Sequence, residues 1–269
     1  MLTRAVRIDA GIDDGIDDGT TVGVVRRYIH SYHCPDLPSG FRGCGTALFG
    51  NSGLMIVSKT PILRGAYHRF NKQAAFELHC VDRGALFAEV EGPEPGTKLQ
   101  VFTAHMASGG MVVLAGLHLP PAVQDALTGQ GNGTGVQQAH ELTAFVKEHA
   151  NPSVPPEPGV VTIVAGDLNM RPFHPEYAVV AAGMKELGLV DAYDGVWEPT
   201  FGTVDEHGSP HERLMTHRAD YGTCKELDYV FSSGAKVVDR QIDRCVEKDA
   251  SAGWQQVSDH AAIVVTFEL

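Results

Sequence analysis

Residues 160–169 read Val-Val-Thr-Ile-Val-Ala-Gly-Asp-Leu-Asn, an apolar run that ends in an acid and an amide. The run from Val160 to Ala165 is typical of a strand that is buried on both faces of a sheet. Gly166 allows the backbone to turn tightly after the run. If the strand continues, the side chains of Asp167 and Asn169 point to the same face. A simple turn explains the tetrapeptide equally well, because Asp and Asn favour turns.

The segments around this run predict a mixture of strands and helices. Strand patterns occur at residues 54–58, 84–90, 99–105, 226–232 and 261–267. Residues 91–97 are rich in Pro and Gly, and they predict a hairpin that makes the strands on either side antiparallel. Helical periodicity occurs in residues 137–149 and 176–187, and Gly188 suits the end of the second helix. We therefore expect an α/β (α+β) fold with two packed sheets flanked by helices.

The composition sets limits on the class of protein. The chain has 269 residues and a formal net charge of -12, and this charge argues against stable nucleic-acid binding. Its five cysteines include no CxxC pair, so they support neither a zinc site nor a disulfide framework and favour a reducing, cytoplasmic compartment. We find no signal peptide and no apolar run long enough to span a membrane. Residues 1–45 form a Gly/Asp-rich segment without assigned structure, and residues 46–269 form one domain.

Two motifs near the C-terminus carry further acids and an imidazole. Asp228 lies between Leu227 and Tyr229 in a strand pattern. If it is buried it needs a partner, and an imidazole held in one tautomer is the natural one; an exposed strand position is the alternative. Asp259 and His260 are adjacent at the start of the last strand, so they face opposite sides. A histidine with an acid partner suits a general base, although most isolated Asp-His pairs are surface turns.

A second imidazole is expected at a sheet end. His105 closes the strand at residues 99–105, and His118 in the strand-like residues 116–119 is its rival. The apolar patch at residues 111–121 fits a lipid-contacting loop and a buried strand equally well.

The order of these motifs resembles the endonuclease/exonuclease/phosphatase superfamily, the group related to deoxyribonuclease I. Several linking segments resemble more specifically the bacterial and neutral animal sphingomyelinases. These segments are residues 51–62, 66–68 and 83–87. Residues 198–201 resemble the family's Pro-Thr segment, which precedes the Asp-Tyr strand. The interval from Arg83 to the histidine also fits, and it favours His105 over His118. The resemblance covers about residues 45–269 and implies a four-layered, DNase I-like sandwich of two mixed β-sheets flanked by helices.

The resemblance implies a role for each catalytic candidate. His260 would be the general base that activates water, and Asp228 would orient it. Asp167 and Asn169 would position the nucleophile and the phosphate oxygens. His105 would stabilise the phosphoryl group or assist the leaving group.

The resemblance also implies residues that bind substrate and metal. Asn51 and Arg83 would line the substrate groove; family members often carry Lys in place of Arg83, and arginine contacts phosphate with a different geometry. Asp259 would help to bind Mg²⁺, with Mn²⁺ or Co²⁺ as alternatives. The family begins with a strand carrying an Asn and a strand ending in a metal-binding Glu. Residues 1–50 contain neither pattern, so we expect the first strands to be missing and metal binding to be weakened.

The implied function is a Mg²⁺-dependent phosphodiesterase of phospholipase C type. It would hydrolyse sphingomyelin or a similar phospholipid at a membrane surface, releasing ceramide and phosphocholine. An endonuclease or inositol-phosphate phosphatase of the same superfamily is the first alternative, and a catalytically inactive fragment or scaffold is the second. The acidic charge and residues 51–62 favour the lipid. The oligomeric state is not indicated by the sequence.

Overall fold

The computed structural model describes residues 30–33, 54–74, 83–107, 133–150, 157–172, 175–193, 199–200, 226–243, 246–249, 253–256 and 260–269. In chain order the elements are β1 (His30–His33), β2 (Met55–Ser58), β3 (Ile62–Arg69), β4 (Gly84–Glu91), β5 (Lys98–His105), α5 (Thr134–Ala150), β6 (Val160–Asp167), α6 (Pro175–Glu186), β7 (Val190–Asp191), β8 (Asp228–Ser233), β9 (Lys236–Asp243), β10 (Val246–Asp249), β11 (Gly253–Gln256) and β12 (Ala262–Glu268).

The centre of the molecule is a mixed six-stranded sheet with the order β3-β4-β5-β6-β8-β7. Only β5 and β6 are parallel; the other neighbouring pairs are antiparallel. The antiparallel pairing of β4 with β5, which runs from Glu91↔Lys98 to Gly84↔His105, confirms the predicted hairpin. The predicted strand at residues 160–165 is β6, and it lies between β5 and β8.

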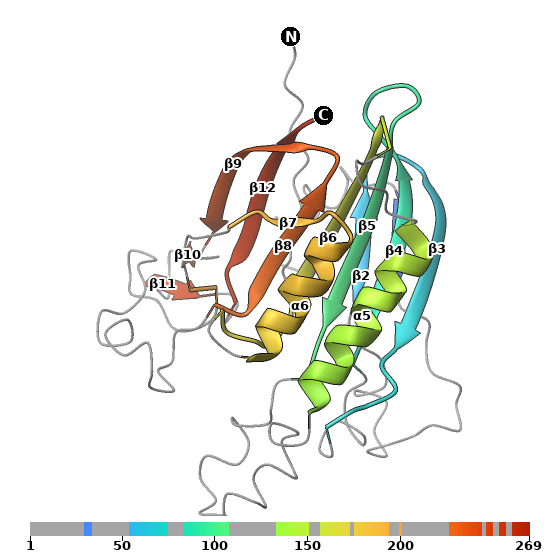
Figure 1. Cartoon of the computed structure of the whole chain (residues 1–269). Coiled ribbons are helices and arrows are strands. Elements are labelled where there is room, and N and C mark those ends of the chain that lie inside the picture. Colours follow the sequence, from blue (N-terminus) through green and yellow to red (C-terminus); the bar gives the residue numbers. More distant parts are fainter. Residues whose placement is uncertain are drawn as a thin grey trace, which may run out of the picture.

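Both faces of this sheet are buried, as the continuous apolar run in β6 indicates. On one face α5 and α6 lie side by side and pack through Leu142, Phe145 and Met184 (Figure 1). On the other face β2 and β12 contribute a second core that includes Ile56 and Ile263. The three layers seen in the described residues confirm an α+β sandwich of packed sheets with helices.

The end of α6 follows from one glycine. Gly188 has φ +74°, a left-handed backbone that glycine adopts without steric cost. The Gly188 amide donates to Lys185 O at 3.0 Å, and the Leu189 amide donates to Met184 O at 2.9 Å. These are the two hydrogen bonds of a Schellman motif, and the buried side chains of Met184 and Leu189 accompany it. The predicted end of the helix at this glycine is confirmed.

Two long strands were not predicted. All residues of β9 are exposed or half-buried, and its sequence, Lys-Val-Val-Asp-Arg-Gln-Ile-Asp, carries no clear apolar alternation. The strand β3 is an edge strand of the central sheet and is likewise only partly buried. Neither α5 nor α6, the helices within the described ranges, combines the length and apolar character that a membrane span requires.

Candidate active site

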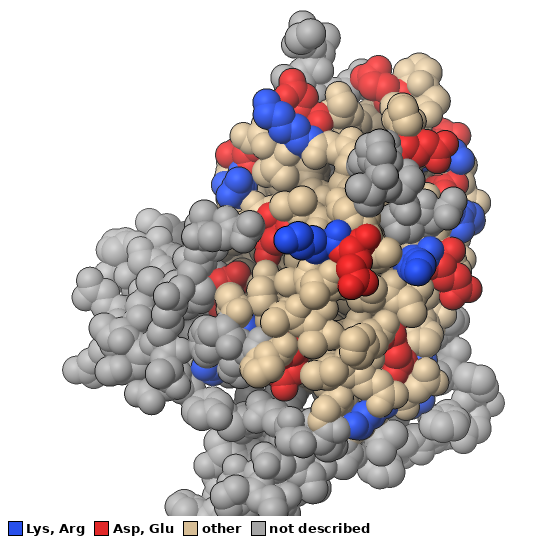
Figure 2. Space-filling view, viewed as in Figure 1, with Lys and Arg blue, Asp and Glu red and all other residues tan. Residues whose placement is uncertain are grey.

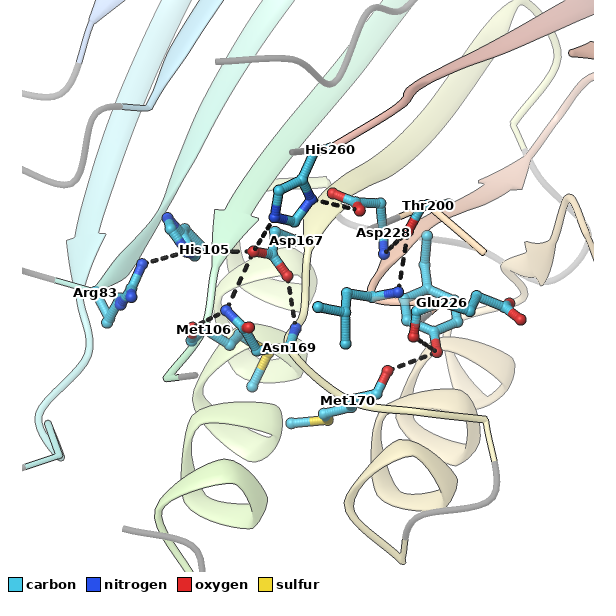
Figure 3. Close-up of polar contacts among 12 residues, drawn as sticks. Arg83, His105, Met106, Asp167, Asn169, Met170, Thr200, Glu226, Asp228 and His260 are labelled. Carbon is cyan, nitrogen blue, oxygen red and sulfur yellow. Dashed lines mark hydrogen bonds and ion pairs between the residues drawn. The ribbon is translucent and has the colours of Figure 1, made fainter. Parts of the chain in front are cut away.

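Three polar side chains form a row across one end of the central sheet. In the strand register His105 is paired with Asp167, and Asp167 is paired with Asp228. Ala165 lies two residues before Asp167, and Val230 lies two residues after Asp228. Both side chains belong to the core that faces β2 and β12. Because side chains alternate along a strand, the row projects toward that second layer. His260 reaches the row from this layer, because it lies just before β12 (Figure 3).

A close backbone approach holds two members of the row in register. Gly166 precedes Asp167, has φ +146° and is paired with Ala104. A Cβ atom at Gly166 would lie 2.2 Å from Ala104 O, so no larger residue fits without a shift of the backbone. The glycine was predicted to allow a tight turn. The structure instead places it within β6, where its lack of a side chain lets two strands approach.

Asp167 and Asn169 come together through a turn rather than through a continued strand. Asn169 has φ +52°, a conformation that Asn tolerates better than most residues. Its backbone N–H donates to Asp167 Oδ1 at 2.8 Å. Its side-chain Nδ2 donates to Met106 O at 2.8 Å and lies 3.2 Å from Asp167 Oδ2. The sequence left two readings of this segment as alternatives, a simple turn and a side-by-side carboxylate and amide. In the structure the turn itself brings the carboxylate and the amide together.

The contact between Asp228 and His260 joins the two layers. Asp228 is only 5% exposed, and its Oδ2 lies 2.8 Å from His260 Nδ1. An ionised carboxylate only accepts, so Nδ1 carries the proton and Nε2 is the basic nitrogen of the imidazole. His260 Nε2 lies 3.8 Å from Asp167 Oδ2. The imidazole is thus fixed in one tautomer between two acids, as a general base requires.

Thr200 supports the Asp228–His260 contact through hydrogen bonds to the backbone at or next to each of the two residues. Its hydroxyl oxygen accepts the amides of Leu227 and Asp228 at 3.0 and 3.1 Å. Its carbonyl accepts the Ala261 amide at 2.6 Å. One residue therefore positions the start of β8 and the residue that follows His260. The Pro-Thr segment was noted in the sequence, but this positioning role was not predicted.

Arg83 lies at the opposite end of the row, next to His105. A guanidinium only donates, so the Arg83 Nη1 donates to His105 Nε2 when that nitrogen is unprotonated. His105 Nε2 also lies 3.3 Å from Asp167 Oδ2, to which it can donate when protonated. The buried Gln73 holds the Arg83 backbone: its Oε1 accepts the Arg83 amide at 2.9 Å, and its Nε2 donates to Arg83 O at 2.9 Å. This clamp was not predicted.

The two carboxyl groups of the row have opposite pKa shifts. Burial opposes ionisation of Asp167, but the hydrogen bond and charge of His105, together with the charge of His260, hold the pKa of its carboxyl below the usual value. Burial is also the largest influence on Asp228, and with the charge of Asp167 it raises the pKa of that carboxyl against the hydrogen bond from His260. Neighbouring acids with divergent pKa values are typical of sites that transfer protons.

The donor atoms can also be compared with the needs of a metal ion. Asp167, Asp228 and His260 each offer one ligand atom, and these atoms lie within 4.8 Å of one another. Magnesium prefers oxygen ligands and is usually held by one or two carboxylates. The two aspartates fit this preference. The imidazole fits it less well, because it offers nitrogen and its Nδ1 is paired with Asp228.

The predicted site residues divide into two groups. The structure brings together Arg83, His105, Asp167, Asn169, Asp228 and His260 (Figure 3). Asn51, Asp259 and the rival His118 lie outside the described residues, as does the apolar patch at residues 111–121. The chemical roles assigned to all of these residues remain predictions.

The helix-covered face of the molecule carries charges of both signs. Figure 2 shows Lys and Arg side chains next to Asp and Glu, with no continuous basic area among the described residues of this face. The prediction that the chain does not bind nucleic acid stably stays a prediction.

Comparison with known proteins identifies the family. Residues 7–260 match the Endonuclease/Exonuclease/phosphatase family, and the match begins inside the segment 1–45 that the sequence left unassigned. None of the curated proteins compared with the chain matches it.

Solved structures share the fold at low sequence identity. Sphingomyelinase C from Streptomyces griseocarneus is 18% identical, with a TM-score of 0.53 over 93% of this chain and 82% of that one. Beta toxin from Staphylococcus aureus is 18% identical, with a TM-score of 0.52 over 91% and 80%. A mannosyl-6-phosphatase from Bacteroides thetaiotaomicron is 14% identical, with a TM-score of 0.52 over 80% and 70%. With the family match over most of its length, the chain belongs to the endonuclease/exonuclease/phosphatase family.

Proposed function

We propose that this protein is a magnesium-dependent phosphodiesterase of phospholipase C type that hydrolyses sphingomyelin or a similar phospholipid to ceramide and phosphocholine. The observation that carries the reaction type is the placement of the His260 imidazole between Asp228 and Asp167, at 2.8 and 3.8 Å. The choice of substrate is supported by the sphingomyelinase-like segments at residues 51–62 and 83–87 and by the likeness in fold to sphingomyelinase C.

In this reaction His260 Nε2 takes a proton from water, and the water oxygen attacks the phosphorus. The bond from phosphorus to the ceramide oxygen breaks on the opposite side, and a protonated His105 imidazole gives that oxygen its proton as ceramide leaves. His260 then releases its extra proton to solvent and His105 takes one up, which restores both imidazoles. Asp228 keeps the proton on Nδ1 and stabilises the imidazolium that forms. A positioned base of this kind typically contributes about 10²–10⁴ in rate.

The remaining residues act on the phosphoryl group. Asn169 and Asp167 orient the attacking water, and the charge of Arg83 offsets negative charge on the phosphate while its neighbour His105 assists the leaving group. Asp167 and Asp228 are the described residues that fit a magnesium ion, and Asp259 is the further ligand that the resemblance implies. When bound, the ion would supply additional charge to offset the phosphoryl oxygens. A beta toxin structure with bound magnesium, 19% identical to this chain, is consistent with that requirement.

Release of phosphocholine from sphingomyelin micelles, with and without magnesium, tests this proposal. We expect activity that needs the metal and falls by at least ~10² in His260→Ala, if His260 is the base. His140, an exposed histidine of α5, provides the matched control, and His140→Ala should leave the rate unchanged. Equal rates for wild type and His260→Ala would contradict the assignment.

The same preparations should be assayed with abasic duplex DNA, inositol phosphates and mannose 6-phosphate. Cleavage of one of these and not of sphingomyelin would move the assignment to another member of the family. A folded protein that hydrolyses none of the four and does not bind magnesium would support an inactive scaffold.

A further inference from the structure

A buried glutamine outside the active site contacts the backbone that supports Asn169. Gln138 lies in α5, is fully buried and has both ends of its side-chain amide engaged. Its Oε1 accepts the Ala107 amide at 2.8 Å, and its Nε2 donates to Lys72 O at 2.7 Å. Lys72 follows β3 and Ala107 follows β5, so this one side chain ties together two chain segments that leave the sheet at the site end.

The Ala107 amide belongs to the same peptide group as the Met106 carbonyl. That carbonyl accepts Asn169 Nδ2 at 2.8 Å, and Nδ2 also lies 3.2 Å from Asp167 Oδ2. The Met106 amide donates in turn to Asp167 O at 3.0 Å. A chain of contacts therefore runs from Gln138 through one peptide group to the Asn169 amide and the Asp167 carboxylate. Figure 3 shows the part of this chain from Met106 through Asn169 to Asp167.

The direction of these hydrogen bonds determines which way the Asn169 amide faces. Met106 O and an ionised Asp167 Oδ2 are both acceptors, so both contacts must be made by the NH₂ group. A rotation of the amide by 180° would set its oxygen against two other oxygens. The Met106–Ala107 peptide is in turn held by Gln138, because its N–H donates to that side chain. If Gln138 were lost, the half-buried Ala107 N–H would lose its acceptor, and nothing from α5 would then hold the peptide in this orientation.

We infer that Gln138 is a positioning residue that fixes the orientation of Asn169 through the Met106–Ala107 peptide. Gln138 touches neither the row nor the substrate in this arrangement; it acts through the peptide. The inference rests on the proposed function for its kinetic consequence, since Asn169 matters to a rate only if the site is catalytic. Its structural part, the coupling of Gln138 to Asn169, is independent of the reaction.

Gln138→Met tests the inference, because methionine keeps a similar volume and removes both hydrogen bonds. Leu142→Ala is the matched control, since Leu142 is also fully buried in α5 but packs only in the apolar core. The first readout is the side-chain NH₂ resonance pair of Asn169 in ¹⁵N-labelled protein without substrate, identified by its loss in Asn169→Gly. We expect these resonances to shift in Gln138→Met and to stay in place in Leu142→Ala. If methionine prevents folding, Gln138→Ala gives the same readout.

The second readout is kinetic. We expect kcat to fall about 10–100-fold in Gln138→Met, as for a misplaced positioning group, with a smaller change in KM. In an Asn169→Gly background the same substitution should cause no further loss of kcat, because its effect passes through the Asn169 side chain. Unchanged Asn169 resonances, or losses of kcat that add in the double variant, overturn the inference. Absence of activity in the wild type overturns the proposed function and leaves the resonance test decisive for the coupling.

Discussion

His260 Nδ1 lies 2.8 Å from Asp228 Oδ2, although the two residues belong to different layers of the sandwich. Asp228 opens a strand of the central sheet, and His260 precedes a strand of the second layer. The hydrogen bond is made at a point where the two layers also share Thr200. The contact therefore depends on correct packing of the layers, and the chemistry assigned to His260 depends on the contact.

Asp228→Asn should impair the reaction more than the fold. An asparagine keeps the size of the side chain but no longer demands a proton on His260 Nδ1, so the tautomer that activates water is not enforced. We expect kcat to fall by about 10²–10⁴ while the unfolding midpoint changes little. The measurement is phosphocholine release together with thermal unfolding. A variant that keeps the wild-type rate would remove Asp228 from the mechanism.

Gly166→Ala should destabilise the protein by about 2–4 kcal/mol, from a left-handed backbone and a clash with a neighbouring strand. The added Cβ would meet Ala104 O at 2.2 Å. Gly96 is the control, because it also has positive φ but has no atom within 4 Å of its ideal Cβ position. Gly96→Ala should cost only the backbone term, about 1 kcal/mol. Urea unfolding of both variants gives the comparison, and equal losses would rule out the close approach as the cause.

Tyr229→Phe should cost about 1–2 kcal/mol, because the Tyr229 hydroxyl is buried and donates to Met170 O at 2.6 Å. Met170 follows Asn169, so the loss should also loosen the turn that holds the Asp167 carboxylate. Tyr193 offers a matched control, because its hydroxyl donates to Gln241 O at 3.1 Å at an exposed position. In urea unfolding Tyr193→Phe should cost less than Tyr229→Phe. The reverse order would contradict the assignment of the buried bond.

Glu141 should contribute stability that depends on pH. Burial opposes its ionisation, but the hydrogen bond from the Asn71 amide and the contact with His68, at 2.8 and 2.9 Å, hold the pKa of its carboxyl below the usual value of 4.5. A folded-state pKa below the unfolded one means that the stabilisation is complete above 4.5 and is lost as the pH falls through the folded-state value.

Urea unfolding of Glu141→Gln across this pH range tests the expectation. The free energy of unfolding of Glu141→Gln should be lower than that of wild type near neutral pH, and this difference should shrink below pH 4.5. Glu148→Gln, a substitution at an exposed position of the same helix, is the matched control for removing a carboxylate from α5. A difference between wild type and Glu141→Gln that is constant with pH would show that the carboxylate charge is not involved.

The elements predicted from the sequence were those with strong periodicity. The apolar run that became β6 and the hairpin of β4 and β5 have patterns that burial imposes on the chain. The strand β9 has no such pattern because most of its residues are exposed, so nothing in its composition separates it from a loop. Its position is determined by pairing with β12, a contact between distant parts of the chain.

The candidate site shows the same division. Acids and imidazoles at the ends of strands are visible in the sequence because their chemistry is unusual beside apolar residues. Gln73, Gln138 and Thr200 hold the site through hydrogen bonds to backbone atoms of distant segments. Such bonds require no particular spacing and no particular partner residue. Their roles therefore could not be predicted without coordinates.

The row at the end of the sheet has a consequence for misfolding. Asp167 faces the second layer only while β6 keeps its register with β5 and β8. A slip by one residue would turn this carboxylate toward Phe102 and the helices, where it would meet hydrocarbon in place of an imidazole. A slipped chain would thus bury an uncompensated acid and also dismantle the row. The polar row therefore disfavours pairings of β6 that are out of register. Turnover per mole of refolded protein would report the fraction of chains in which the strands have paired correctly.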